Sequence, residues 1–332
     1  MTSIQLSHGG GGVEMNELLH SLFYKYFSNE TLLKAEDAAV LEVNGKIAYT
    51  TDSYTVSPIV FKGGNIGTIA VAGTLNDIAM MGAKPLYLSA GFMIEEGLDY
   101  ETLELIVKSM ADELSHTEAK IVCGDTKVVP KGAVDKIFIN TSGIGIVEYE
   151  GISAHNISDS DAIIVSNEVG KHGATIFAHR EGVESSENLK SDCAVLYPAI
   201  KELLASGVKV KALRDATRGG LSAVLNEWAE ASNICLEIEE SGIKVSDEVR
   251  GLCELFGFEP YDLANEGTFV IAVADEDKEK ALKVLQENSL TTKASIIGEA
   301  TTKKIGKVIL KNPWGSTRYL ELPKGELLPR IC

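Results

Sequence analysis

The residue with the most suggestive chemistry is Cys332, which carries both a thiol and the terminal carboxylate. It ends a tail that begins near residue 313, where Pro323, Pro329 and the lack of a helical period predict irregular structure. About twenty residues at roughly 3.3 Å each could span on the order of 60 Å. We therefore expect an exposed, movable nucleophile; the alternative is a frayed end whose cysteine is accidental.

The other four cysteines show no paired spacing typical of metal ligands, and their low density does not indicate a disulfide framework. They are Cys123, Cys193, Cys235 and Cys253. We interpret them as small apolar residues, as free cysteines usually are. Only Cys332 has a sequence context that predicts exposure.

Carboxylates recur where predicted strands and helices meet loops. The polar residues at these junctions are Asp37, Asp52, Asp125 and Thr126, while Asn76 and Asp77 lie within the helix predicted over 67–81. Carboxylates from separate elements could share Mg²⁺, which favours oxygen ligands and usually bridges to phosphates. Lys127, placed after the strand that ends near Gly124, adds a point charge for a phosphate. Each aspartate alone is more typical of a turn or a helix cap, so only the joint pattern indicates phosphate chemistry.

The run from Arg214 to Gly220 follows a short apolar strand and opens a predicted helix. Free backbone N–H groups at such a helix start, together with Arg218, could hold a phosphate, and Asp215 could hold its metal. Thr217, Gly219 and Gly220 belong to the same segment. A purely structural glycine-rich helix entry remains open, because this run is not a Walker loop.

The formal net charge of −17 argues against nucleic acid and anionic lipid surfaces as partners, because both repel an acidic protein. No apolar run approaches the roughly 20 residues needed to span a bilayer, and the first residues lack a basic start followed by an apolar stretch. We therefore expect a cytoplasmic protein with neither a nucleic-acid nor a membrane partner.

Two halves must position these residues. In the first, periodicity predicts helices over 14–27, 67–81 and 100–118, and strands over 38–43, 46–51, 86–93, 120–124 and 137–147. Asn44-Gly45 predicts a tight hairpin between the first two strands. In the second, it predicts strands over 162–166, 210–213, 234–238, 268–273 and 294–298, and helices over 196–206, 219–231, 247–256 and 276–287. This is an α/β or α+β pattern, with domains at 1–150 and 151–312 and a tail at 313–332.

Together these motifs resemble a family of ATP-dependent enzymes that includes aminoimidazole ribonucleotide synthetase, selenophosphate synthetase and thiamine-monophosphate kinase. Within that family the chain is most similar to the HypE proteins of hydrogenase maturation. The similar segments, over nearly the whole chain, are 7–12, 51–54, 63–67, 124–129, 214–220, 265–267 and 329–332. The last, Pro-Arg-Ile-Cys, is the most specific.

The resemblance implies a two-domain aminoimidazole ribonucleotide synthetase-like fold, with an N-terminal sheet domain that forms a homodimer and binds ATP near its interface. It implies that a HypF-type carbamoyltransferase loads Cys332, and that ATP and Mg²⁺ drive dehydration of the thiocarbamate to a thiocyanate. Cyanide would then pass to iron on a HypC–HypD-type scaffold, for a NiFe hydrogenase. The candidate nucleotide-binding residues are Asp37, Asp52, Asn65, Asn76, Asp77, Asp125, Thr126, Asp215, Thr217, Arg218, Gly219 and Gly220, and the five aspartates are the candidate metal ligands.

Dehydration also requires a base for the nitrogen protons, and Glu266 and Lys127 are the candidates. His8 and the glycines at 9–12 could fold over phosphates, because glycine permits close backbone approach. His172 could meet the substrate or cap a helix.

Two other functions remain open on the residues alone. The chain could phosphorylate or activate a small molecule, although the Pro-Arg-Ile-Cys tail argues against this. It could also be an ATP-responsive interaction module whose tail is a docking peptide. Dependence of ATP turnover on a carbamoylated Cys332 would separate the enzyme from the module.

Overall fold

The computed structural model describes residues 2–184, 186–324, 328 and 330–332. After a 3-10 helix (Leu6–Gly9), the chain forms one continuous helical run made of α1 (Val13–Leu18), a π-helical turn (Leu19–Phe23) and α2 (Tyr24–Tyr26), which confirms the predicted first helix. No helix in the described part of the chain is long and apolar enough to cross a membrane.

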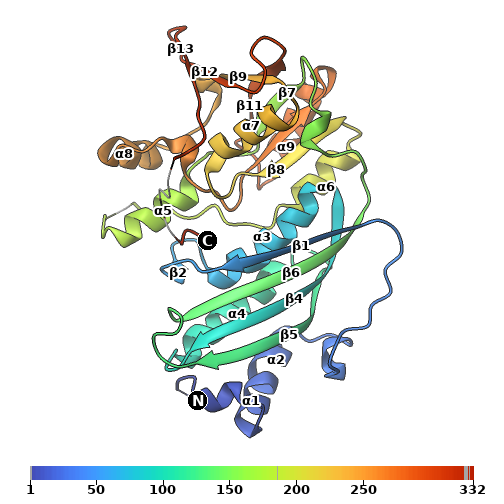
Figure 1. Cartoon of the computed structure of the whole chain (residues 1–332), viewed down its shortest axis with the longest axis vertical. Helices are drawn as coiled ribbons and strands as arrows, with labels where there is room; N and C mark the ends of the chain where they lie inside the picture. Colours follow the sequence, from blue (N-terminus) through green and yellow to red (C-terminus); the bar gives the residue numbers. More distant parts are fainter. Residues whose placement is uncertain (1, 185, 325–327, 329) are drawn as a thin grey trace.

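Within the described residues, the first half forms a four-stranded sheet in the order β1 (Ile47–Tyr54), β6 (Ile137–Val147), β4 (Ala83–Glu95), β5 (Lys120–Val129). Strands β4 and β5 are parallel, so their connection must cross one face, and α4 (Tyr100–Leu114) makes that crossing. Helix α3 (Ile66–Met80) lies on the same side of the sheet (Figure 1). A short hairpin, β2 (Val60–Phe61) and β3 (Gly64–Asn65), precedes α3.

The two faces of this sheet differ because side chains alternate along a strand. Leu88, Ala90, Phe92 and Ile94 of β4 point toward the helices and are buried. The opposite face carries exposed apolar side chains, which are Ile47 (54% exposed), Tyr49 (66%) and Met93 (40%). We call this surface the open sheet face.

Two predictions for the first half are wrong. Residues 38–43 form no strand: β1, the partner predicted for them, pairs with β6 along one edge, and its other edge carries no strand in the described residues. Strand β5 does not end near Gly124 but continues to Val129, since β4 extends to Glu95 and offers it a pairing edge. Asp125, Thr126 and Lys127 therefore lie inside a strand rather than in the loop after it.

The second half is a seven-stranded sheet in the described residues, in the order β13-β12-β9-β11-β7-β10-β8. Its strands are β7 (Ala162–Val165), β8 (Val210–Asp215), β9 (Cys235–Glu239), β10 (Phe269–Val273), β11 (Ser295–Thr301), β12 (Val308–Lys311) and β13 (Thr317–Tyr319). Its helices are α5 (Lys171–Arg180), α6 (Tyr197–Ala205), α7 (Gly220–Ala231), α8 (Asp247–Phe256) and α9 (Lys278–Glu287). Most of the predicted elements of this half are confirmed within a few residues.

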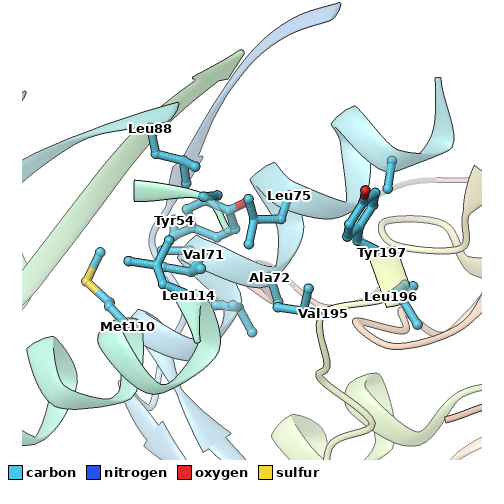
Figure 2. Close-up of a cluster of buried hydrophobic side chains, with 14 of the residues drawn as sticks. Tyr54, Val71, Ala72, Leu75, Leu88, Met110, Leu114, Val195, Leu196 and Tyr197 are labelled. Carbon is cyan, nitrogen blue, oxygen red and sulfur yellow. The ribbon is translucent and has the colours of Figure 1, made fainter. Parts of the chain in front are cut away.

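Helix α3 joins the two halves. It is apolar around its whole circumference, as expected of a helix with no solvent face, and 14 of its 15 residues are buried. Figure 2 shows Val71, Ala72 and Leu75 of this helix between Tyr54 of β1 and the segment from Val195 to Tyr197. Asn76 adds a polar clamp, because its side chain donates to the Ala194 carbonyl (3.0 Å) and accepts from the Leu196 N–H (2.7 Å).

The tail is not the exposed, irregular tether that the sequence predicts. Residues 317–319 form β13, which pairs with β12, and the final residues return to the junction between the halves, beside β2 (Figure 1). Ile331 is buried, and Cys332 packs against the main core. The sequence could not show this docking, because the groups that bind the tail belong to residues between positions 55 and 180, far from the tail along the chain. Pro329 and residues 325–327 lie outside the described residues.

Candidate active site

The last three residues are held by their backbone carbonyl groups. The Cys332 carbonyl accepts hydrogen bonds from the Thr55 N–H (2.9 Å) and hydroxyl (3.3 Å). The Ile331 carbonyl accepts from His172 Nε2 (2.8 Å). The Arg330 carbonyl accepts from the Ser57 N–H and the Arg180 guanidinium. Because backbone atoms make these contacts, they fix where the tail lies without reading its side chains.

The Arg330 side chain supplies the sequence-specific contact. Its guanidinium donates from Nε to the Thr55 carbonyl (2.8 Å) and pairs with Asp135 (2.8 Å). It also lies over the Phe138 ring, 5.4 Å from the ring centroid. Arg330 thereby ties the tail to the end of β1 and to β6.

The thiol of Cys332 lines a cavity of about 310 Å³ with residues from both halves, among them Ser53, Thr55 and Arg218. Burial, followed by the charge of Glu266, raises the pKa of the Cys332 thiol to about 12, and Arg218 opposes the shift. A docked, unmodified tail is therefore a poor nucleophile at neutral pH.

Glu266, whose charge acts on this thiol, is buried, with 4% of its surface exposed. Burial and then the charges of Asp215 and Asp192 raise its pKa well above the usual range, and Arg218 opposes them. Asp192 also holds the backbone around Glu266, accepting from the N–H groups of Glu266 (3.0 Å) and Gly267 (3.1 Å) and from the Thr268 hydroxyl (2.9 Å).

An anionic cleft of about 800 Å³ lies between the halves, lined by Asp52, Asp77, Asp215, Thr217 and Arg218 among others. Asp77 accepts from the Thr50 hydroxyl (2.7 Å). Burial and then the charge of Asp77 raise the pKa of Asp215 to about 7, and burial also raises the pKa of Asp77. Such repulsion between carboxylates is what a bound cation would relieve.

Arg218 lines both the anionic cleft and the thiol cavity, so it links the two spaces. It sits just before α7, whose entry needs two glycines with positive φ, Gly219 (76°) and Gly220 (60°). A side chain on Gly220 would also meet the Tyr261 and Leu263 carbonyl oxygens at 2.4 and 2.5 Å. The backbone shape predicted for an anion-binding helix start is therefore present.

The remaining predicted residues do not join this cleft within one chain. Asp125 and Lys127 pair with each other (2.7 Å) on β5, three strand spacings or about 14 Å from β1. Thr126 between them is buried. Asp125 instead lines a cavity of about 180 Å³ with Glu36 and Ala38, the neighbours of the exposed Asp37.

Two predicted ligands have structural roles. Asn65 caps α3, accepting from the N–H groups of Gly67 (2.8 Å) and Thr68 (3.2 Å) and donating to Ser109 (2.7 Å). Asn76 clamps the two halves, as described above. Among the described residues, no three His, Cys, Asp or Glu side chains lie close enough together to hold a metal ion.

The N-terminal glycines and His172 also have clear positions. Gly9 packs on β5, where a side chain would meet the Val128 nitrogen at 2.6 Å, so this segment lies beside Asp125 and Lys127. His172 is fully buried and binds the tail carbonyl rather than capping a helix or facing the cleft.

Comparison with known proteins agrees with this geometry. The AIR synthase related protein family matches over residues 35–147 with its N-terminal domain and over 158–311 with its C-terminal domain. Carbamoyl dehydratase HypE of Escherichia coli (strain K12) is 45% identical, and the match covers all of both chains. This chain belongs to the HypE family. The membership confirms the predicted carbamoyl dehydratase activity and the aminoimidazole ribonucleotide synthetase-like fold.

Solved HypE structures superpose closely. A HypE in complex with ATP is 40% identical, with a TM-score of 0.95 and 99% of each chain covered. A chain of a HypE–HypF complex is 42% identical, with a TM-score of 0.81, covering 92% of this chain and 99% of that one.

Sequence reasoning missed the residues that hold the tail and the base, namely Thr55, Arg180, Ser191 and Asp192. None stands in a pattern that indicates chemistry. Their roles depend on chain segments that are distant in sequence, and only the fold brings these segments together.

Proposed function

We propose that this chain dehydrates an S-carboxamide on its own Cys332 to a thiocyanate, with ATP as the dehydrating reagent, to supply the cyanide ligands of a NiFe hydrogenase. The observation that carries this proposal is the docked terminal thiol, which is partly buried, shares a cavity with Arg218 next to an anionic cleft, and is within the influence of the Glu266 charge. Burial also excludes water, which would otherwise hydrolyse an activated intermediate.

The reaction needs two bond exchanges. The carboxamide oxygen attacks the γ-phosphorus of ATP, so an O–P bond forms and ADP leaves. The C–O bond then breaks, phosphate leaves with its electron pair, and the two nitrogen protons are lost to give C≡N on Sγ. The protein mainly positions the groups and stabilises charge. Arg218 balances the developing charge, and Glu266 accepts a proton, because a carboxylate with a raised pKa is a stronger base once ionised.

Asp52, Asp77 and Asp215 fit Mg²⁺, which prefers oxygen ligands and keeps bonds to water and phosphate. The raised pKa values of Asp77 and Asp215 support this assignment, because a cation would favour their ionised forms. Bound Mg²⁺ would neutralise phosphate charge. Since the carboxylates do not form a complete metal cage, phosphate oxygens would have to complete the coordination.

A homodimer would explain the second group of predicted residues. Asp37, Asp125 and Lys127 lie far from the docked thiol of their own chain, and the open sheet face leaves Ile47 and Tyr49 exposed. We propose that a second copy packs on this face, so that Asp125 and Lys127 of one copy serve the ATP of the site near the interface. Lys127 would then act on phosphate rather than as the base.

The partners follow from the same proposal. The tail must leave its cavity to receive the carbamoyl group, and a HypF-type carbamoyltransferase is the donor, in line with the solved HypE–HypF complex of a relative. The thiocyanate would pass its cyanide to iron on a HypC–HypD-type scaffold. We place these reactions in the cytoplasm, as the sequence predicts.

The test is mass spectrometry of the Lys-C peptide 325–332. The protein is first incubated with a carbamoyl donor system and then with or without Mg²⁺–ATP. We expect a carbamoyl adduct that loses one water only when ATP is present. An adduct that keeps its mass with ATP, or an unmodified Cys332 beside a donor shown to be active on another acceptor, would refute the proposal.

A further inference from the structure

Two neighbouring residues, Ser191 and Asp192, each position one of the two groups that the proposed reaction brings together. These groups are the base and the tail that carries the thiol. Asp192 holds the backbone that carries the base, through three hydrogen bonds to residues 266–268. Ser191 holds the ring of His172, and His172 holds the carbonyl of Ile331, next to the thiol. The backbone of the base and the backbone of the tail are therefore both anchored to the same two adjacent residues.

The tail side of this arrangement is a buried relay. His172 Nε2 lies 2.8 Å from the Ile331 carbonyl, which can only accept, so Nε2 carries the proton. His172 Nδ1 then accepts from the Ser191 hydroxyl (2.8 Å). Burial lowers the pKa of His172, in agreement with a neutral ring. The ring edge also packs against Phe61, with 5.4 Å between the ring centroids.

The segment itself has little freedom to move. The Ser191 N–H donates to the Lys62 carbonyl (2.9 Å). A Cβ atom on Gly63 would lie 2.8 Å from the backbone carbonyl oxygen of Ser191, and a Cβ atom on Gly267 would lie 1.7 Å from the backbone carbonyl oxygen of Asp192. Only glycine permits these two approaches, so the segment is fixed against both β2 and the loop of Glu266.

We propose that Ser191 and Asp192 are positioning residues that set the carboxamide on Cys332 against Glu266. Their Cα atoms are about 3.8 Å apart, so the groups they hold cannot drift independently. Reacting atoms must lie about 3–3.5 Å apart, and a misplacement of about 1 Å can cost on the order of 100-fold in rate. This inference rests on the proposed dehydration and assigns these residues no direct contact with the reacting atoms.

Tail docking is tested on unmodified, full-length protein by the rate at which iodoacetamide alkylates Cys332, read from the peptide 325–332. His172→Ala should raise this rate about tenfold or more, and Ser191→Ala should raise it less. His172→Gln keeps an N–H donor and should remain near the wild-type rate. His155→Ala is the matched control, because His155 is an exposed histidine that bonds the Ala231 carbonyl (2.8 Å) away from the tail. An unchanged rate in His172→Ala would overturn the tail half of the proposal.

Base placement is tested on carbamoylated protein with Mg²⁺–ATP. Asp192→Asn should slow water loss roughly 10- to 100-fold while alkylation of unmodified Cys332 stays within about twofold of wild type. Thr268→Ala, which removes one of the three donors, should slow it less and serves if Asp192→Asn does not fold. Asp275→Asn, which removes a surface aspartate paired with Lys278, is the charge control.

The alkylation rate and the dehydration rate together distinguish a positioning role from a general loss of structure around the tail. Asp192→Asn or Thr268→Ala with a wild-type dehydration rate would refute the inference, and so would variants in which both readouts always change together. Failure of the wild-type protein to lose water would instead refute the proposed function, and the alkylation experiment, which needs no ATP, would still judge the docking relay.

Discussion

At the scale of single residues, Glu266 is the side chain on which the proposed chemistry depends most. Glu266→Gln keeps the size of the side chain but removes its ability to accept a proton, so we expect normal carbamoylation of Cys332 and dehydration slowed by about 10²- to 10⁴-fold. The mass of the peptide 325–332 over time with Mg²⁺–ATP measures both steps. Glu254→Gln, an exposed change on α8, should leave both unchanged. Normal dehydration in Glu266→Gln would remove this residue from the mechanism.

Asp215 gives a prediction about pH and metal. Its pKa of about 7 exceeds the ordinary value of roughly 4, so folding takes up a proton between these pH values. The stabilising contribution of this carboxyl is complete below about pH 4 and is lost as the pH rises through 7. Asp215→Asn cannot ionise, and we expect its metal-free unfolding temperature at pH 8 to exceed that of wild type by roughly 2–4 °C.

The same thermal measurement, repeated with Mg²⁺–ATP, tests the proposed ligand role of Asp215. Wild type should gain stability on binding, and Asp215→Asn should gain much less. At pH 4 the two proteins should unfold at similar temperatures. An Asp215→Asn variant that is less stable than wild type at pH 8, yet is stabilised by Mg²⁺–ATP as much as wild type, would contradict both the predicted pH effect and the proposed role of Asp215 as a metal ligand.

The sequence was enough to single out residues whose side-chain chemistry can be recognised without knowing the fold. A terminal thiol, clustered aspartates and the Asn265-Glu266-Gly267 segment are recognisable without a fold. It could not separate Asn65, which caps a helix, from Asp52, which lines the cleft, because both occur beside predicted strands or helices. Nor could it find Asp192, whose role exists only because the chain brings residues 192 and 266 together.

At the scale of elements, α3 depends on its N-terminal cap. Asn65→Ala removes the acceptor for two backbone N–H groups, and we expect a loss of about 1–2 kcal/mol, or roughly 2–4 °C or more in unfolding temperature. Asp99→Ala at the start of α4 is the matched control, because Asp99 makes no side-chain cap bond there and should change little. Equal losses in both variants would show that the cap of α3 has no special importance.

Elements were predictable where hydrophobic periodicity decides them, as for α4 and β6. The errors arose where pairing decides. Residues 38–43 read as a strand but do not pair with the free edge of β1, whereas β5 gains five residues because β4 is long enough to pair with them. Strand ends depend on a partner that local sequence does not specify.

At the scale of the whole molecule, the proposed site is complete only if two chains share it. Tyr49→Glu places a charge on β1, the edge strand of the open sheet face, in a protein whose net charge is already −17. We expect a dimer in wild type and a monomer in this variant, measured by light scattering or sedimentation. Dehydration should fall at least about tenfold, because Asp125 and Lys127 of the second chain would no longer reach the ATP.

The control for Tyr49→Glu is Leu255→Glu on α8, which adds the same charge at an apolar side chain that is 72% exposed on the other half of the molecule. It should keep the mass and activity of wild type. A monomeric but fully active Tyr49→Glu would mean that one chain suffices, and that Asp125 and Lys127 do not serve the reaction. A dimeric Tyr49→Glu would mean instead that the chains meet elsewhere, because burying an unpaired charge in a sheet interface costs several kcal/mol.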